Sequence, residues 1–407
     1  MNTINKYLDR YAEPESNLIR SPVQPIQYVL VIPAFKESLS QLEQVWSKLT
    51  NLIVILVVNS ADASEPVTGK LLDDIEANWR QIQSSQNCTW YQSQQQVILV
   101  VDRYTNPIPP RQGVGKARKI GADIALRLIN NGDVLTPWIM STDADAILPG
   151  DYFNAATDEL AFLLYPFLHD LPDEAAALYE FSLLWYAYGL KFAGSNYAYP
   201  TVGSTIACQA NAYAQVRGFP QRSAGEDFYL LNKLRKIGPF ALADSHPIQL
   251  SSRESDRVPF GTGTGIKSIR SLPAPIRDYL FYHPQCFVSL GRFLNALQTC
   301  QPRRNLKAHF KDPIHWQFME QQGLDKLILS KQEQTAGVFD KFLTDWFDGF
   351  KTLKFVHFIR EHQHGSVAFE NLWQSELLPK HLPRSSADTG IQPIDIQTAT
   401  TSLWNNL

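Results

Sequence analysis

The feature that most constrains this chain is a series of short apolar runs, each of which ends near a polar residue. The runs are rich in β-branched residues and cover 28–32, 53–58, 97–101 and 138–140. Runs this short and this continuously apolar are typical of strands buried on both faces, as in a parallel sheet. Helical patterns separate them, at 39–49, 67–83 and 115–129. The alternation predicts an α/β fold with crossover helices.

Outside this alternation of strands and helices, the sequence predicts segments of other kinds. We expect a polar lead-in over 1–26, an α/β domain over 27–270, a helical region over 271–378 and a loosely structured tail over 379–407. In open α/β sheets, ligands bind beyond the carboxyl ends of the strands. The polar residues that end the apolar runs (Glu37, Asn59, Asp102 and Asp143) are therefore candidates for a binding site.

Composition excludes several classes of protein. Lys and Arg number 37 against 40 Asp and Glu, a net charge of −3, which argues against a general nucleic-acid binder. The four cysteines are far apart and none has CxxC spacing, so neither a zinc ribbon nor a disulfide framework is expected. No apolar run is long enough to cross a bilayer. We expect a cytoplasmic protein without an integral membrane span.

The strongest local motif is the D-x-D arrangement of Asp143 and Asp145, directly after the fourth apolar run. Carboxylates at a strand end can bind one hard divalent cation, such as Mg²⁺ or Mn²⁺, which shares its other positions with phosphates. The alternative is a surface turn in which the spacing arises by chance. Its position after a strand favours the metal site.

A second acidic pair, Glu226 and Asp227, precedes a helical pattern. One of these carboxylates could act as a general base that takes a proton from an acceptor hydroxyl. The competing explanation is electrostatic, because acidic residues in the first turn of a helix interact favourably with its dipole.

Basic residues and histidine supply further candidates. Lys116 and Arg118 follow Gly113 at an expected helix start, where they could face an anionic ligand or simply be solvated. His246 could complete a site begun by carboxylates, or be a structural residue that only forms hydrogen bonds. Arg253 and Arg257 precede a glycine-rich stretch, and this loop could close over a diphosphate or be an ordinary surface loop.

The order of these motifs resembles the nucleotide-sugar glycosyltransferases of the GT-A type, in particular the family-two-like group, over about residues 27–265. Residues 32–37 (IPAFKE) are similar to that family's opening motif, Pro-Ala-Tyr-Asn-Glu. Asn59 stands where the family usually has an Asp. The acidic motifs of 143–145 and 226–227 follow in the family's order.

The resemblance implies a GT-A, Rossmann-like catalytic domain and assigns roles to individual residues. The expected donor-binding residues are Pro33, Ala34, Glu37, Asn59, Asp102, Lys116 and Asp143, with Arg253 and Arg257 adding positive charge near the phosphates. The expected metal ligands are Asp143, Asp145 and His246. Asp227, beside Glu226, would be the base, or would bind the acceptor if the enzyme retains stereochemistry.

The expected function is therefore a metal-dependent glycosyltransferase, specifically a hexosyltransferase. It would move a sugar from a nucleotide-sugar donor to a hydroxyl on a small molecule, a glycan or a lipid-linked acceptor, with no nucleic-acid partner. One alternative is a nucleotidyltransferase acting on a sugar phosphate, which normally has a glycine-rich loop after the first strand; 34–38 contains no glycine. Another is a non-catalytic nucleotide-sugar-binding protein on the same fold.

Overall fold

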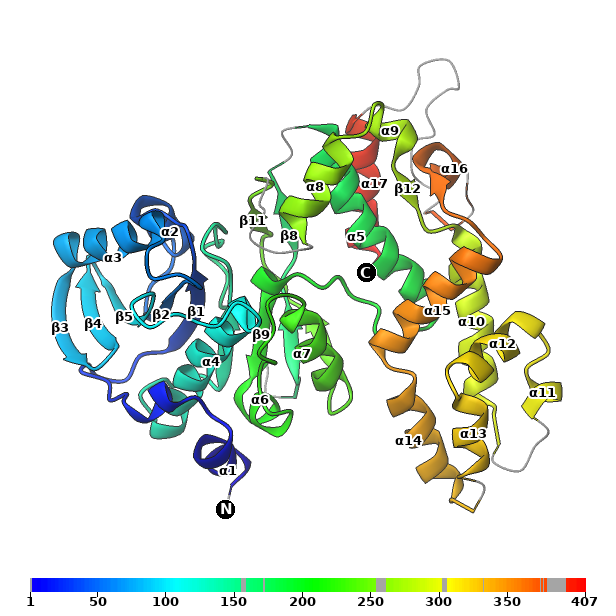
Figure 1. Ribbon diagram of the computed structural model, residues 1–407, viewed down its shortest axis with the longest axis horizontal. Coiled ribbons are helices and arrows are strands. Elements are labelled where there is room, and N and C mark those ends of the chain that lie inside the picture. The colour runs from blue at the N-terminus through cyan, green and yellow to red at the C-terminus, as the bar shows by residue number, and fades with distance from the viewer. Residues whose placement is uncertain are drawn as a thin grey trace. The chain divides into compact units, whose positions relative to one another are not determined.

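The chain folds into two compact units in the computed structural model (Figure 1). The structure describes residues 2–154, 159–170, 173–253, 261–301, 306–331, 333–373, 375, 377–378 and 393–407. Unit 1 comprises Met1–Asp170 and Thr201–Thr264, and unit 2 comprises Leu171–Pro200 and Gly265–Leu407. This division differs from the expected one, because 1–26 folds with unit 1 whereas 171–200 folds with the later helices.

Unit 1 contains a sheet with helices on its faces. Its helices are α1 (Thr3–Arg10), η1 (Pro14–Asn17), α2 (Leu39–Val45), α3 (Pro66–Asn78), α4 (Gly113–Asn131), η2 (Gly203–Thr205), α6 (Ala210–Gln215) and α7 (Glu226–Arg235). Its strands are β1 (Tyr28–Ala34), β2 (Leu52–Asn59), β3 (Arg80–Ser85), β4 (Cys88–Ser93), β5 (Gln96–Arg103), β6 (Trp138–Ser141), β7 (Phe162–Leu164), β8 (Phe167–His169), β9 (Ile206–Gln209), β10 (Phe240–Leu242) and β11 (Ile248–Leu250).

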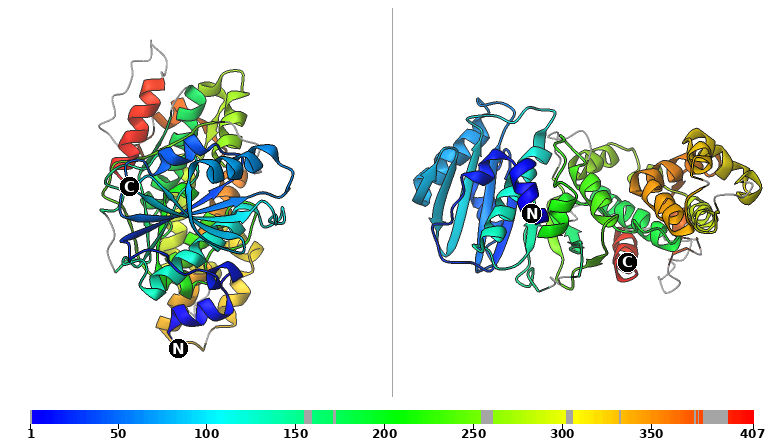
Figure 2. Two further views of the ribbon diagram at one scale, coloured as in Figure 1. Left: turned by 90° about the vertical axis from the view of Figure 1, so that its left-hand side faces the viewer. Right: turned by 90° about the horizontal axis from the view of Figure 1, so that it is seen from below.

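The described strands of unit 1 form a nine-stranded sheet in the order β10-β7-β9-β6-β1-β2-β5-β4-β3, with a separate pair, β11-β8. The sheet is twisted, as the fanned strands in the left view of Figure 2 show. The neighbours β6, β1, β2 and β5 run parallel to one another. Every residue of β2 is buried, as a strand covered on both faces requires. The predicted α/β class is confirmed, with a large mixed sheet whose central neighbours β6, β1, β2 and β5 are parallel.

One predicted helix is too long. The pattern over 67–83 predicts a single helix, but α3 ends at Asn78 and Arg80–Ser85 forms strand β3. β3 pairs with β4, which pairs antiparallel with β5, so this hairpin extends the sheet at one edge. Most of β3 is polar and exposed because it is the edge strand. It therefore carries no apolar period that distinguishes it from the helix before it.

Helix α4 packs against the centre of the sheet. It contacts β1, β2 and β6. Gly121 allows this approach, because a Cβ atom there would overlap the side chain of Val31 in β1. Gly132 ends the helix with a left-handed φ of 82°, a conformation that glycine adopts at little cost.

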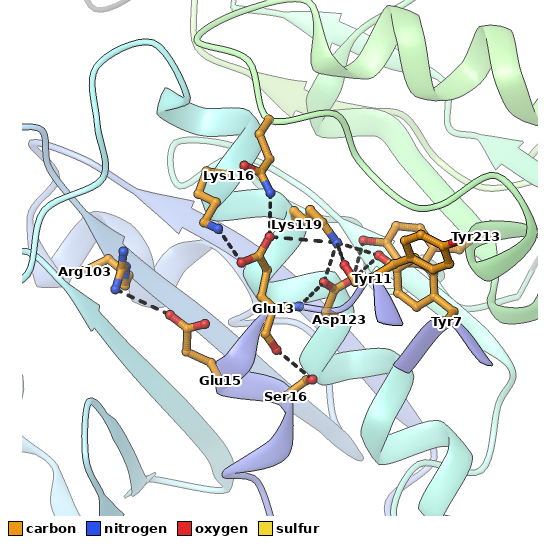
Figure 3. Close-up of polar contacts among 11 residues, drawn as sticks. Tyr7, Tyr11, Glu13, Glu15, Ser16, Arg103, Lys116, Lys119, Asp123 and Tyr213 are labelled. Carbon is orange, nitrogen blue, oxygen red and sulfur yellow. Dashed lines mark hydrogen bonds and ion pairs between the residues drawn. The ribbon is translucent and has the colours of Figure 1, made fainter. Parts of the chain in front are cut away.

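The N-terminal segment is anchored to α4 by a buried polar network (Figure 3). The carboxylate of Asp123 is fully buried. Its Oδ1 accepts hydrogen bonds from the hydroxyls of Tyr7 (2.6 Å) and Tyr213 (2.9 Å). Its Oδ2 accepts hydrogen bonds from the Lys119 amine (2.7 Å) and from the backbone N–H of Glu13 (2.8 Å). This network ties α1 and the segment before η1 to α4 and α6.

Unit 2 is mostly helical. Its elements are α5 (Glu174–Phe192), α8 (Thr262–Arg270, which begins in unit 1), α9 (Pro275–Asp278), β12 (Leu280–Phe281), α10 (Pro284–Gln298), α11 (Leu306–His309), α12 (Pro313–Gln321), α13 (Leu324–Leu329), α14 (Ala336–Trp346), α15 (Gly349–His362), β13 (Val367–Ala368), α16 (Phe369–Trp373) and α17 (Pro393–Asn405). The apolar helix α5 packs against α9, α10 and α17. Within the described residues, no helix is both long and apolar enough to cross a membrane.

The expected loose tail is ordered in its last part. Helix α17 buries Ile396, Ala399 and Leu403. These residues repeat at helical spacing, which explains why one face of α17 packs against α5.

We predict that Asp123→Asn lowers the free energy of unfolding by about 3–5 kcal/mol, because it removes the carboxylate charge that lies closest to the buried Lys119 ammonium group. Urea denaturation followed by circular dichroism measures this loss. Asp73→Asn is the matched control, since Asp73 is exposed on α3, and it should change stability by less than about 0.5 kcal/mol. Equal effects of the two substitutions would contradict a structural role for the network.

Candidate active site

The carboxyl ends of the central strands meet along one edge of the sheet. Asn59 at the end of β2 aligns with Arg103 at the end of β5, and Ala34 at the end of β1 aligns with Val58. Because β6, β1, β2 and β5 are parallel neighbours, the polar residues that follow them lie at the same edge. The structure therefore brings the ends of the four predicted strands together.

Arg118 of α4 joins the two acidic motifs at this edge. Its side chain is buried, with 2% of its surface exposed. Nε donates to Oε1 of Glu226 at 2.9 Å, and Nη2 forms an ion pair with Oδ1 of Asp143. Nη1 donates to Oγ of Ser141 at 2.8 Å. One guanidinium group thus connects the end of β6 to the start of α7.

Gly203 leaves room for this guanidinium group. A Cβ atom on Gly203 would lie 2.8 Å from Nη2 of Arg118 and 3.4 Å from Oδ2 of Asp227. The first distance is too short for a side chain to be accepted without moving the arginine. This close approach is a physical reason for glycine at position 203.

A second arginine connects the ends of β1 and β6. Arg253 pairs through Nη2 with Oε1 of Glu37, and its Nε lies 3.0 Å from Oδ2 of Asp145. The Glu37 side chain is almost completely buried, whereas a third of the Arg253 side chain is exposed. The predicted donor residue Arg257 lies outside the described residues.

The acidic pair at the start of α7 is held in two different environments. Glu226 is buried, whereas Asp227 is partly exposed and accepts the backbone N–H of Phe228 at 2.7 Å. Burial, together with the negative charge of Asp227, raises the pKa of Glu226 to about 7 against the opposing charge of Arg118. Burial also raises the pKa of Asp227. A carboxyl group with a raised pKa is suited to proton transfer near neutral pH.

The remaining predicted donor residues differ in how they are placed. Pro33 and Ala34 are buried within β1. Asn59 is 8% exposed, and its Oδ1 has no hydrogen-bond partner among the described residues. Asp102 uses Oδ1 to accept the backbone N–H groups of Tyr104 (2.8 Å) and Thr105 (2.9 Å), so it stabilises the turn after β5.

Two predicted residues pair with other partners. Lys116 forms an ion pair with Glu13 of the N-terminal segment. His246 is 85% exposed, and its Nδ1 lies 2.8 Å from a carboxylate oxygen of Asp151. The structure does not bring His246 into one cluster with Asp143 and Asp145.

The predicted metal site can be tested against these contacts. Asp143 and Asp145 have the oxygen donors that Mg²⁺ and Mn²⁺ prefer. Each carboxylate is nevertheless paired with a guanidinium group. In the part of the chain that the structure describes, no group of three His, Cys, Asp or Glu side chains is placed to hold a metal ion. The described residues do not by themselves form a cation site, and the predicted cation stays a prediction.

The central role of Arg118 is the main feature that sequence reasoning missed. We expected Arg118 to face an anionic ligand, but its partners are the protein's own carboxylates. The sequence does contain an indication that Arg118 is buried, because it lies three residues from both Gly115 and Gly121 in a helix. That spacing places it on the same face as two glycines, where a helix can pack closely against its neighbours.

Comparisons with known proteins give distant likenesses. No protein-family model and no curated protein matches the chain. A solved structure of S. aureus TarS in complex with UDP-GlcNAc is similar at 12% identity and a TM-score of 0.36, over 66% of this chain and 67% of that one. The mannosyltransferase PcManGT from Pyrobaculum calidifontis, in complex with GDP-Man and Mn²⁺, is similar at 12% identity and a TM-score of 0.34, over 86% of this chain and 92% of that one. At TM-scores this low, a function for this chain has to be argued from its own residues.

We predict that titration of the Glu226 carboxyl group makes the free energy of unfolding depend on pH. Because its pKa is raised from 4.5 to about 7, folding favours its protonated form. Its contribution to stability is complete below pH 4.5 and is lost as the pH rises through about 7. Relative to Glu226→Gln, the wild-type protein should therefore lose stability over this range, by at most about 1.4 kcal/mol per pH unit.

Urea denaturation of both proteins between pH 4 and pH 8 measures this difference. Glu76→Gln, at an exposed position of α3, is the control. A difference between wild type and Glu226→Gln that stays constant with pH would contradict the prediction.

Proposed function

We propose that this protein is a glycosyltransferase that moves a sugar from a nucleoside-diphosphate donor to an acceptor hydroxyl. The observation that carries the proposal is the cluster of Asp143, Glu226 and Asp227 around the buried Arg118, at the carboxyl edge of a parallel sheet. The sequence resemblance to GT-A glycosyltransferases, in particular to the family-two-like group, supports the same chemistry, and we propose a hexosyltransferase.

The donor is assigned to the ends of β1, β2 and β6. The resemblance implies that Pro33, Ala34 and Glu37 would line the nucleotide, and Asn59 stands where the family usually has an Asp. The unpartnered Oδ1 of Asn59 supports a hydrogen bond to a ligand donor group. Arg253 is partly exposed and lies between Glu37 and Asp145. A guanidinium group in this position is suited to a diphosphate, which gains negative charge as the sugar bond breaks.

The acceptor is assigned to the side of α7. Asp227 is partly exposed, whereas Glu226 is buried against Arg118. We assign Asp227 as the group that removes the proton from the acceptor hydroxyl as the hydroxyl oxygen attacks the sugar. Glu226 then acts through Arg118 rather than on the substrate.

We further propose that donor binding depends on Mg²⁺ or Mn²⁺. Asp145 would be the ligand, and its pairing with Arg253 would have to open before a cation could bind. When bound, such a cation would neutralise charge on the diphosphate leaving group. Calorimetric titration of the protein with a nucleoside diphosphate, with and without Mn²⁺, measures whether the cation increases the affinity. An affinity that does not change with Mn²⁺ would indicate a donor site that relies on arginine alone.

We predict that the protein binds one nucleoside diphosphate selectively and that Asp145→Ala weakens this binding by about tenfold or more, equivalent to about 1.4 kcal/mol. The substitution removes one of the two carboxylates that orient Arg253. Calorimetric titration with a panel of nucleoside diphosphates measures the affinities. Asp244→Ala, at an exposed position of the same unit, is the control. Unchanged binding by Asp145→Ala would contradict the donor site.

We predict that Asp227→Asn slows sugar transfer by about 10²–10⁴-fold and leaves donor affinity unchanged, because it removes a base and keeps the shape of the side chain. Single-turnover transfer measures the first quantity, and calorimetry measures the second. Parallel loss of both would instead assign Asp227 to the donor. Release of pyrophosphate, rather than of a nucleoside diphosphate, would identify a nucleotidyltransferase.

A further inference from the structure

The guanidinium group of Arg118 is bound by acceptors of the protein itself. Its guanidinium group contacts side chains of Asp143, Ser141 and Glu226, and Nη1 also lies 3.4 Å from the carbonyl oxygen of Thr142. These acceptors belong to the end of β6, the turn after it and the first turn of α7. Because Arg118 is buried and engaged by the protein on each of its three nitrogens, it is not available to bind the diphosphate.

The charges around Arg118 explain why such a group is needed. Asp143, Glu226 and Asp227 all interact electrostatically with the guanidinium group. Three carboxylates this close together repel one another, and for the buried Glu226 there is the added cost of removing its hydration. A single buried cation reduces both costs and sets the positions of the carboxylates that it contacts.

The contacts within the acidic pair are unequal. Nε of Arg118 takes Glu226 as its partner, while the hydrogen bond of Asp227 comes from the backbone N–H of Phe228. As a whole residue, Asp227 is also partly exposed, whereas Glu226 is buried. Arg118 therefore distinguishes two neighbouring carboxylates that the sequence alone presents as equivalent.

We infer that Arg118 is a positioning residue that couples the donor side of the site to the acceptor side. It holds Asp143 and Glu226 in fixed places and so leaves Asp227 as the carboxylate that accepts the proton of the acceptor. This inference rests on the proposed glycosyltransferase function, since it assigns a part in that reaction to a residue that touches neither substrate.

Gly203 provides a way to test the role without removing any member of the cluster. A methyl group at this position would press on Nη2 of Arg118 and displace the guanidinium group. The variant Gly203→Ala therefore keeps all the charges and changes their geometry. Arg118→Lys makes the complementary change, because an ammonium group keeps the charge but lacks the planar fork that spans Glu226 and Asp143.

The experiment compares wild type, Gly203→Ala and Arg118→Lys in sugar transfer with the donor found by calorimetry. We expect each variant to lower kcat by about tenfold or more, because the base is misplaced, and to weaken nucleotide binding by a smaller factor, because Arg118 also holds Asp143 on the donor side. The control is Gly150→Ala, because the nearest atom to a Cβ there is the Lys48 carbonyl oxygen at 4.0 Å. The control should retain wild-type kcat.

A double-mutant cycle gives the second readout. If Arg118 couples the two sides, Asp143→Asn and Glu226→Gln should be non-additive in kcat when Arg118 is present and additive in the Arg118→Lys background. A residue that only stabilises the fold would lower the unfolding temperature and leave both kcat and the coupling unchanged.

The outcomes separate this inference from the proposed function. Wild-type kcat in both Gly203→Ala and Arg118→Lys, or additivity in the presence of Arg118, would overturn the positioning role while leaving the glycosyltransferase intact. A wild-type protein that is folded but neither binds a nucleotide nor turns over a donor would overturn both.

Discussion

The pairing of buried charges along helix α4 is the constraint on which unit 1 depends. Arg118 pairs with Asp143 and Glu226, and one residue further on Lys119 pairs with Asp123. A charge removed from water is costly unless a partner compensates it. The helix can therefore be buried only together with the segments that carry those partners. These segments include the end of β6, the start of α7 and, through Asp123, the N-terminal residues around Tyr7.

This dependence links the N-terminal segment to the candidate active site. Glu13 pairs with Lys116 and accepts a hydrogen bond from Gln221 at 2.7 Å, which lies in the segment leading to α7. The backbone N–H of Gly115 donates to the carbonyl oxygen of Arg222 in the same segment. A stretch that reads as a polar lead-in is thus part of the support for Glu226 and Asp227. Its polar character reflects the buried network that it completes.

Arginine side chains compensate the acidic residues of the candidate site. Both aspartates of the D-x-D motif pair with arginines that come from distant parts of the chain, Arg118 and Arg253. The guanidinium groups supply positive charge in the position where the motif alone suggests a metal ion. The D-x-D motif therefore concentrates negative charge at the end of β6. Its arginine partners determine which ligands can bind there. Arg118 is closed off by its contacts, and Arg253 is partly open to solvent.

Sequence patterns by themselves determined the α/β class, the positions of the four central strands and the acidic motifs at their ends. These features depend on local apolar runs and on the parallel sheet that such runs must form, which places strand ends on a common edge. Only the tertiary structure decided that 171–200 folds with the later helices, that 80–93 forms a hairpin, and that Arg118 faces carboxylates instead of a ligand. Each of these depends on partners far away in the chain, because burial and charge pairing are set by what packs against a residue and not by its neighbours in sequence.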